Sequence, residues 1–183
     1  MASPRAIRVI SGKWGNQTIY APMNFRSRPM GERQRQAIFN SLIDDLPGAI
    51  VLDAYAGSGA IGIEAISRGA EQSYFVEKNY SVYKQIRNNL QNLKVPEKQY
   101  QLFRCSAHAF TKTMKNLKFN IIIADPPYTE FKIEQIEELA VMLAKGGILI
   151  ISSPASEEMP PTILSLNLTR QKKMAAAQLS FYS

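Results

Sequence analysis

The sequence predicts an α/β protein with a mostly parallel β-sheet that is covered by helices on both faces. From residue 49 onward, short apolar runs alternate with stretches of helical periodicity, which is the pattern of repeated strand–helix–strand units. The apolar runs are almost continuous, as in strands that are buried on both faces. The length of 183 residues and the 45% of hydrophobic residues suit one domain with its own core.

Two elements are expected before this alternating region. Residues 5–20 predict a small β-hairpin, because two β-prone runs flank a segment that contains two glycines. Residues 31–46 predict a helix, because their apolar side chains fall on one face and a Pro-Gly pair then ends it. We expect a basic hairpin extension over residues 1–25 and the α/β domain over residues 26–183.

The alternating region predicts seven strands and four helices. The carboxyl ends of parallel strands share one edge of a sheet, where ligands bind at the point at which the strand order reverses. Motifs that directly follow a strand should therefore meet at this edge. The expected strands span residues 49–53, 73–77, 99–104, 119–124, 148–152, 163–170 and 178–182, and the expected helices span residues 60–68, 79–93, 107–114 and 133–143.

The composition argues against several classes of protein. The single Cys105 excludes a disulfide scaffold and indicates a reducing compartment. Together with the single His108, it cannot fill a tetrahedral zinc site, so we expect no metal. No apolar run approaches the roughly 20 residues that span a bilayer, and the N-terminus has no signal-peptide core. We expect a cytoplasmic protein without membrane contact.

The positive charge is concentrated at the N-terminus. Lysine and arginine together number 22 and the acidic residues 15, which gives a net charge of +7. Residues 1–36 hold seven of the basic residues and one of the acidic ones. A basic segment on a nearly neutral body indicates a polyanionic partner, most often nucleic acid. The alternative is a basic tail that is merely solvated.

A glycine-rich turn follows the first apolar strand. It reads Gly57-x-Gly59-x-x-Gly62, with Asp53 at the end of the strand. The spacing alone matches a dinucleotide site, in which a helix N-terminus faces a pyrophosphate. A carboxylate beside a pyrophosphate would be repulsive, so Asp53 favours a cationic nucleoside–amino-acid ligand such as S-adenosylmethionine. A structural turn without a ligand is the remaining alternative.

An acidic residue also ends the second strand of the alternating region. Glu77 lies 20 residues after Gly57, and a carboxylate at this place can accept hydrogen bonds from both ribose hydroxyls of a nucleotide. This contact is common to dinucleotides and to S-adenosylmethionine. Glu77 therefore predicts a nucleoside-containing ligand without deciding between the two.

The most specific motif is Asp125-Pro126-Pro127-Tyr128, at the end of the strand expected over residues 119–124. Two prolines stiffen the backbone and remove two N–H donors, so the segment presents acceptors: the Asp125 carboxylate and the Pro126 carbonyl. Tyr128 adds an aromatic face. Two acceptors beside a stacking platform suit a planar base that carries an exocyclic amino group. The alternative is a simple turn capped by a proline pair.

These motifs together resemble the amino-methyltransferases that use S-adenosylmethionine to methylate exocyclic nitrogens of bases. Nearly the whole chain resembles one such family, the RsmD family, which methylates guanine N2 in 16S ribosomal RNA. The resemblance implies a Rossmann-like class I S-adenosylmethionine-dependent methyltransferase with a seven-stranded sheet. It is carried by Arg8–Trp14, by Arg28-Pro29 with Arg33 and Phe39-Asn40, by Asp53–Ala60, by Glu64–Ala70 and by Leu179–Tyr182.

The resemblance also implies roles for particular residues. Catalysis is expected from Asp125, Pro126, Pro127 and Tyr128. The cofactor, which leaves as S-adenosylhomocysteine, is expected to contact Asp53, Tyr55, Ala56, Gly57, Ser58, Gly59, Glu77, Lys78, Ser106, Ala107 and Asp125. The target base must leave its stack, and the expected phosphate contacts around it are Arg8, Lys13, Arg26, Arg28, Arg33 and Arg35. The implied partner is ribosomal RNA or the small subunit, and the implied state is a monomer.

The sequence departs from the usual family pattern at three places, Met30–Glu32, Ser106 and Ala175–Ala177. Three other functions stay open at this point. One is a DNA methyltransferase that acts on adenine or cytosine, although the chain has no spare length for a separate recognition domain. The others are an NAD-dependent oxidoreductase and a non-catalytic ribosome assembly factor with the same fold.

Overall fold

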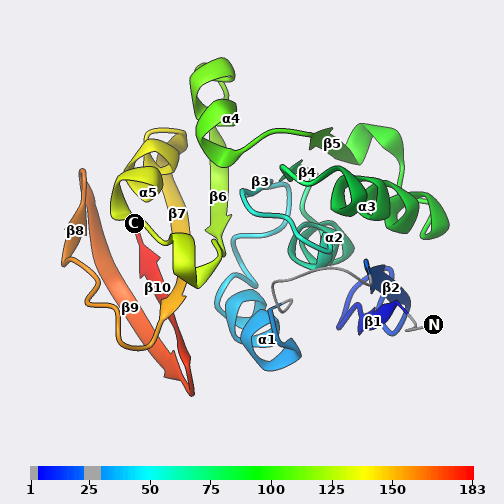
Figure 1. The fold of residues 1–183 in the computed structure, drawn as a ribbon, viewed down its shortest axis with the longest axis horizontal. Helices are drawn as coiled ribbons and strands as arrows, with labels where there is room; N and C mark the ends of the chain where they lie inside the picture. The colour runs from blue at the N-terminus through cyan, green and yellow to red at the C-terminus, as the bar shows by residue number, and fades with distance from the viewer. Residues whose placement is uncertain (1–3, 23–29) are drawn as a thin grey trace.

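An eight-stranded sheet runs through the molecule (Figure 1), in a computed structural model that describes residues 4–22 and 30–183. Its order is β5-β4-β3-β6-β7-β10-β9-β8, in which β5 to β7 are parallel and the last three strands are antiparallel to their neighbours. The strands are β3 (Ile50–Asp53), β4 (Gln72–Val76), β5 (Tyr100–Phe103), β6 (Phe119–Ala124), β7 (Leu143–Pro154), β8 (Thr162–Ile163), β9 (Leu166–Met174) and β10 (Ala177–Tyr182).

Helices cover both faces of this sheet, as the alternating pattern predicted. Buried side chains of α1, α2 and α3 pack on one face, and those of α4 and α5 on the other. No helix in the described part of the chain is long and apolar enough to cross a membrane. The helices are α1 (Glu32–Ser41), α2 (Ala60–Ser67), α3 (Tyr80–Asn92), α4 (Ala107–Thr113) and α5 (Ile133–Ala140), with short 3-10 turns η1 (Glu97–Gln99) and η2 (Tyr128–Glu130).

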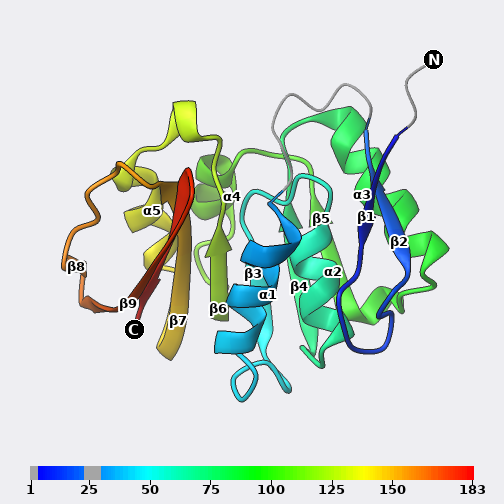
Figure 2. The same ribbon diagram turned by 90° about the horizontal axis from the view of Figure 1, so that it is seen from below.

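The strand order reverses at β3. The chain proceeds from β3 to β4 and β5 on one side, and then returns to place β6 on the other side of β3. The connections that leave β3 and β6 therefore diverge, which opens a crevice at the carboxyl ends of these strands. In Figure 2 this edge of the sheet also carries the N-terminal end of α1.

The N-terminal hairpin forms a separate two-stranded sheet of β1 (Arg5–Arg8) and β2 (Thr18–Ala21), which confirms the predicted hairpin. Apolar side chains of both strands belong to the same buried cluster as residues of α2 and α3, beside which the hairpin lies in Figure 1. The amide of Asn89 in α3 donates to the Tyr20 carbonyl (2.9 Å) and accepts from the Tyr20 N–H (3.1 Å). The expected boundary between residues 25 and 26 falls outside the described residues.

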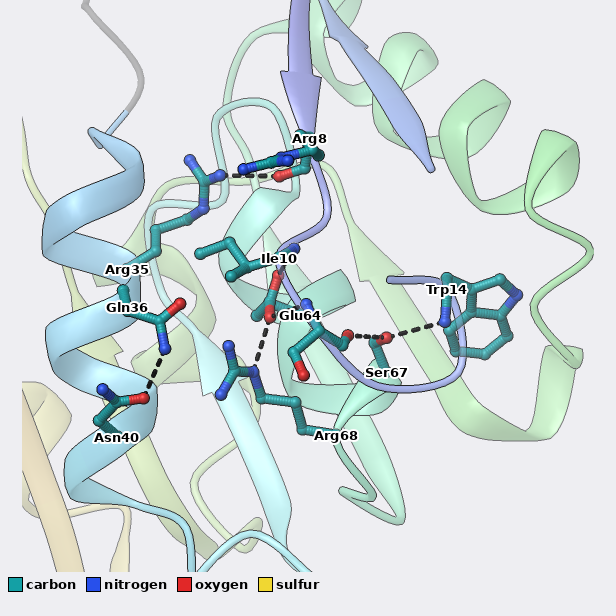
Figure 3. A network of polar contacts seen from close by, with 10 residues as sticks. Arg8, Ile10, Trp14, Arg35, Gln36, Asn40, Glu64, Ser67 and Arg68 are labelled. Atoms are coloured by element: carbon teal, nitrogen blue, oxygen red, sulfur yellow. Dashed lines mark hydrogen bonds and ion pairs between the residues drawn. The ribbon is translucent and has the colours of Figure 1, made fainter. Parts of the chain in front are cut away.

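Buried charged groups join this hairpin to the main body (Figure 3). Glu64 of α2 is fully buried; its carboxylate accepts hydrogen bonds from the backbone N–H groups of Ile10 (2.7 Å) and Ser11 (3.0 Å) and pairs with Arg68 (2.6 Å). On α1, the Arg35 guanidinium donates to the backbone carbonyl of Arg8 at 2.9 Å. The end of β1 and the segment after it are therefore held by two helices of the α/β domain.

The C-terminal strands differ from the sequence prediction. One strand was expected over residues 163–170, but the chain reverses between β8 and β9, and β9 continues to Met174. The reversal takes place at Leu164, which adopts a positive φ of 52° without a glycine or proline to signal a turn. The helix expected over residues 31–46 ends at Ser41, and turns cover the rest of that span.

Candidate active site

A cleft of about 1780 Å³ runs along the carboxyl edge of the parallel strands. Segments that follow β3, β4, β5 and β6 all contribute to its lining, together with one face of α1, the end of β9 and the turn between β9 and β10. The motifs that the sequence placed after separate strands therefore meet in one cavity. This convergence follows from the parallel order of the strands.

The glycine turn between β3 and α2 forms the floor of the cleft. Its backbone is tied to both neighbouring strands, because Ala54 N–H donates to the Ile123 carbonyl (3.0 Å) and Ala56 N–H to the Val76 carbonyl (2.9 Å). Gly59 has a φ of 79°, and a Cβ there would lie 3.1 Å from Ile86. The turn thus requires glycine at this position. The predicted contacts Tyr55, Ala56, Gly57 and Ser58 line the cleft.

Asp53 lies buried beneath this turn. Its Oδ2 accepts a hydrogen bond from Gly62 N–H at 3.0 Å, while its buried Oδ1 has no partner among the described residues. Burial raises the pKa of Asp53 to about 7; the Gly62 hydrogen bond opposes this shift, and the charges of Asp125 and Glu77 add to it. This unpartnered carboxylate oxygen fits a cationic donor, but Asp53 is 1% exposed and is not among the residues that line the cleft.

Glu77 fixes the turn to the end of β4. Its carboxylate accepts from Gly57 N–H at 3.1 Å and from Asn79 N–H at 2.7 Å. Partial burial raises the pKa of Glu77, and these hydrogen bonds oppose the shift. The next residue, Lys78, pairs with Glu130 at 2.9 Å, so an exposed ion pair joins the segments that follow β4 and β6.

Ser106 and Ala107 line the cleft where β5 gives way to α4. Ser106 is the N-cap of this helix, and its Oγ accepts a hydrogen bond from Ala109 N–H at 3.1 Å. The hydroxyl therefore already serves the helix as an acceptor, and its O–H remains as a donor. A donor suits a ring nitrogen of a base better than it suits an amino group.

The Asp125–Tyr128 motif follows β6 directly and lines the same cleft as the glycine turn. Burial raises the pKa of Asp125 to about 6, and a polar contact with Ser152 opposes the shift. The Tyr128 hydroxyl lies 3.0 Å from Ser152 Oγ, and 39% of the Tyr128 surface stays exposed. The tyrosine is thus held at its hydroxyl end while its side chain lines the cleft.

Ser152 is a site residue that the sequence did not reveal. It is buried in β7, beside β6, and reaches both Asp125 and Tyr128. The register explains its position, because Ala124 pairs with Ile151 in the parallel ladder and each following residue is therefore also adjacent. Only knowledge of the register would have identified it.

Those predicted phosphate contacts that lie within the described residues do not form one surface. Arg33 lines the cleft, and the exposed Arg8 pairs with Glu32 at 2.6 Å at the start of α1. Lys13 donates its backbone N–H to the carbonyl of Ser67 (2.7 Å), the last residue of α2, and so lies at the opposite edge of the sheet. Arg26 and Arg28 lie outside the described residues.

Arg35 requires a correction. It is 3% exposed, and its two terminal nitrogens donate to the backbone carbonyls of Met30 (2.8 Å) and Arg8 (2.9 Å). A guanidinium that is committed to buried carbonyls cannot also meet a phosphate at the surface. Arg35 therefore stabilises the fold and does not belong to a surface for nucleic acid.

Three further basic residues line the cleft without having been predicted as contacts: Arg5, Lys172 and Lys173. Arg5 belongs to the basic N-terminal segment. The two lysines belong to the part of β9 beyond residue 170, where we predicted no strand from the sequence. The pair of adjacent lysines was the only signal of a basic patch in this part of the sequence. Whether the pair lies near the site depends on how far β9 extends.

The strand order, the glycine turn below the crevice and the acidic residues at or just after the ends of β3 and β4 define a class of protein. This is the Rossmann-like fold of class I S-adenosylmethionine-dependent methyltransferases, as predicted. Among the described residues, no group of three His, Cys, Asp or Glu side chains is placed to hold a metal ion.

Comparisons with known proteins identify the family. The family model described as "Conserved hypothetical protein 95" matches residues 7–183. The "Putative rRNA methyltransferase YlbH" of Bacillus subtilis is 31% identical over 183 residues, which cover 96% of this chain and 98% of that protein. The "Ribosomal RNA small subunit methyltransferase D" of Escherichia coli K12 is 30% identical, with 96% and 87% covered. The chain belongs to this family, the RsmD family of methyltransferases.

A solved structure agrees with this assignment. The "Putative methyltransferase yhhF from Escherichia coli" superposes with a TM-score of 0.87 at 29% sequence identity, and 97% of each chain is covered. The similarity therefore includes the N-terminal hairpin side of the molecule as well as the central sheet. It confirms the predicted fold over nearly the whole chain.

Proposed function

We propose that the protein transfers a methyl group from S-adenosylmethionine to the exocyclic N2 of a guanine in 16S ribosomal RNA of the small subunit. The observation that carries the proposal is the placement of Asp125 and Tyr128 in the same cleft as the glycine turn and Glu77. The names of the relatives, which are rRNA methyltransferases, support the substrate class.

The residues around the glycine turn fit the proposed cofactor. The free Oδ1 of Asp53 suits the ammonium group of its amino-acid part, and the Glu77 carboxylate suits the ribose hydroxyls. Lys78, Ser106 and Ala107 line the portion left for the adenine ring. When bound, S-adenosylmethionine supplies an electrophilic methyl group on a sulfonium, a chemistry that requires no metal ion.

The Asp125 motif would hold the base. The guanine amino group is a poor nucleophile, because its lone pair is delocalised into the ring. Hydrogen bonds to the Asp125 carboxylate and the Pro126 carbonyl would orient the amine and localise its lone pair, while Tyr128 stacks on the ring. As the nitrogen–carbon bond forms and the carbon–sulfur bond breaks, the amine loses one proton, which Asp125 can accept. Most of the acceleration then comes from positioning the reactants in line.

The phosphate contacts, the cellular location and the oligomeric state that we expected from the sequence belong to the same proposal. Arg8 and Arg33 contact phosphates near the cleft. Arg26 and Arg28, which were predicted from the sequence, remain part of the proposed set of phosphate contacts. Lys13, at the far edge of the sheet, can reach only RNA that extends around the molecule. The protein acts in the cytoplasm as a monomer on ribosomal RNA or on the small subunit.

Labelled methyl transfer tests this function. Small ribosomal subunits from a strain that lacks the protein are incubated with methyl-labelled S-adenosylmethionine, and the RNA is digested to nucleosides. We expect the label in N2-methylguanosine, and none in DNA of the same sequence. Label in another nucleoside would contradict the proposed target. Cofactor binding without any transfer would support an assembly factor instead.

The free oxygen of Asp53 predicts a pH-dependent cofactor affinity. The carboxyl has a pKa of about 7, and a bound ammonium favours its charged form. The affinity for S-adenosylmethionine should therefore rise several-fold from pH 5.5 to pH 7, below the range in which an α-ammonium loses its proton. Asp53→Asn should weaken binding at pH 7 and flatten this rise, measured by calorimetry. The exposed Asp44→Asn is the control, and an unchanged pH profile in Asp53→Asn contradicts the assignment.

A further inference from the structure

The cleft is larger than one cofactor requires. Small-molecule sites usually occupy roughly 300–1,000 Å³, whereas this cleft measures about 1780 Å³. The additional space lies beyond Asp125, between α1 and the turn that joins β9 to β10. It has two walls of different chemistry.

The first wall is the outward face of α1. Residues Ile38 and Phe39 are buried on its inner face, which leaves the polar face toward the cleft. This face begins with the exposed Arg33 and continues with amides, and the Gln36 side chain donates to Asn40 Oδ1 at 2.5 Å. The residues of α1 that line the cleft are Arg33, Gln34, Gln36, Ala37 and Asn40.

The second wall is the end of β9. Arg170 fixes this strand against α1, because its guanidinium donates to Ser41 Oγ at 2.9 Å. Since side chains alternate along a strand, Lys172 points to the same face as Arg170, toward α1, and Lys173 points to the other face but still lines the cleft at the end of the strand. Lys172 and Lys173 are both exposed, and neither forms an ion pair within the described part of the chain.

The two parts of the cleft differ in charge. The acidic lining residues Glu77, Asp125 and Glu130 all belong to segments that follow β4 and β6, on the cofactor side. The lining contributed by α1, β9 and the β9–β10 turn contains cations and amides and no acid among the described residues. The acidic part of the cleft suits a cationic cofactor. The part between α1 and β9 suits a polyanion that also carries uncharged polar groups.

We propose that the groove between α1 and the end of β9 binds the single-stranded RNA that flanks the target guanine. Lys172 and Arg33 contact its phosphates within the groove, Lys173 contacts them where the strand ends, and the Gln36 and Asn40 amides contact base edges or 2′-hydroxyls. A base that leaves its stack brings its neighbouring nucleotides to the rim of the pocket, and this groove starts at that rim. The inference rests on the proposed function and specifies how the substrate is held.

Charge removal on β9 tests this groove. The variant Lys172→Ala/Lys173→Ala is compared with Lys98→Ala/Lys145→Ala, which removes the same charge from exposed lysines that precede β5 or begin β7, at the opposite edge. Binding to a single-stranded RNA oligomer and to small subunits is measured over a series of salt concentrations, separately from methyl transfer. Each lost phosphate contact on a single strand lowers the slope of log affinity against log salt by about 0.7.

We expect the β9 variant to bind RNA at least about tenfold more weakly and to lose a salt slope of about 1.4, the sum of two such contacts. Its affinity for S-adenosylmethionine and its thermal stability should match those of the control. Gln36→Ala/Asn40→Ala should weaken RNA binding without changing the salt slope. RNA affinity and slope that are equal in the two lysine variants would overturn the proposal. These results on RNA binding by the variants would not affect methyl transfer by the wild-type protein. That transfer is the separate test of the proposed function.

Discussion

Asp125→Asn will lower the rate of methyl transfer by about 10²–10³-fold while it leaves S-adenosylmethionine affinity within about threefold of the wild type. This magnitude is the usual effect of removing one directed interaction with the reacting group. Asparagine keeps the shape of the side chain but replaces one acceptor oxygen by a donor, which opposes the amine of the base. Single-turnover kinetics with saturating cofactor separates the transfer step from binding.

The wild-type rate should also depend on pH through the same carboxyl. Its pKa is raised to about 6 by burial, so protonation below pH 6 removes the acceptor and the rate should fall as the pH is lowered. Ser152→Ala removes the contact that opposes this shift, which should move the acidic limb of the profile to higher pH. Ser153→Ala, at the adjacent buried position of β7, is the matched control and should leave the limb in place.

Two outcomes would contradict these roles. If Asp125→Asn abolished transfer and cofactor binding together while the protein stayed folded, Asp125 would belong to the cofactor site. If the acidic limb persisted unchanged in Asp125→Asn, another group would be responsible for it. Asp53 and Glu77, whose pKa values are also raised, would be the next residues to test.

Glu64→Ala will destabilise the protein by about 3–5 kcal/mol, the usual cost of removing one partner from a buried ion pair. The carboxylate is fully buried and accepts from Ile10 N–H and Ser11 N–H, so its loss leaves two backbone donors and Arg68 without their partner. The free energy of unfolding is obtained from urea denaturation monitored by circular dichroism. The Glu71→Ala change, at an exposed position a few residues after α2, should shift it by less than about 0.5 kcal/mol.

Glu64→Gln refines this prediction. The amide can keep one acceptor oxygen for the backbone of the segment after β1 but gives up the charge pair with Arg68, so its stability should lie between those of Glu64→Ala and the wild type. If Glu64→Ala lowered the free energy of unfolding by less than about 1 kcal/mol, apolar packing rather than this polar network would hold the hairpin in place.

The order of elements and the location of the main motifs follow from local sequence patterns. Asp53, Glu77 and Asp125 each come directly after an apolar run, and the structure places them at or just after the ends of β3, β4 and β6. An apolar run followed by a glycine or proline turn determines where a strand ends. The parallel arrangement then brings such ends to one edge, so the site could be located without knowing any distance.

The tertiary structure alone decided which charges are available at that site. Arg33 and Arg35 are two residues apart in the sequence, yet one lines the cleft and the other is buried under carbonyls from the N-terminal segment. Lys172 reaches the cleft only through the length of β9, and Ser152 reaches Tyr128 only through the register of β7 against β6. Local periodicity fixes the fold class, because it reflects which residues must leave water. Which polar group meets which partner depends on packing between distant segments, which no local pattern records.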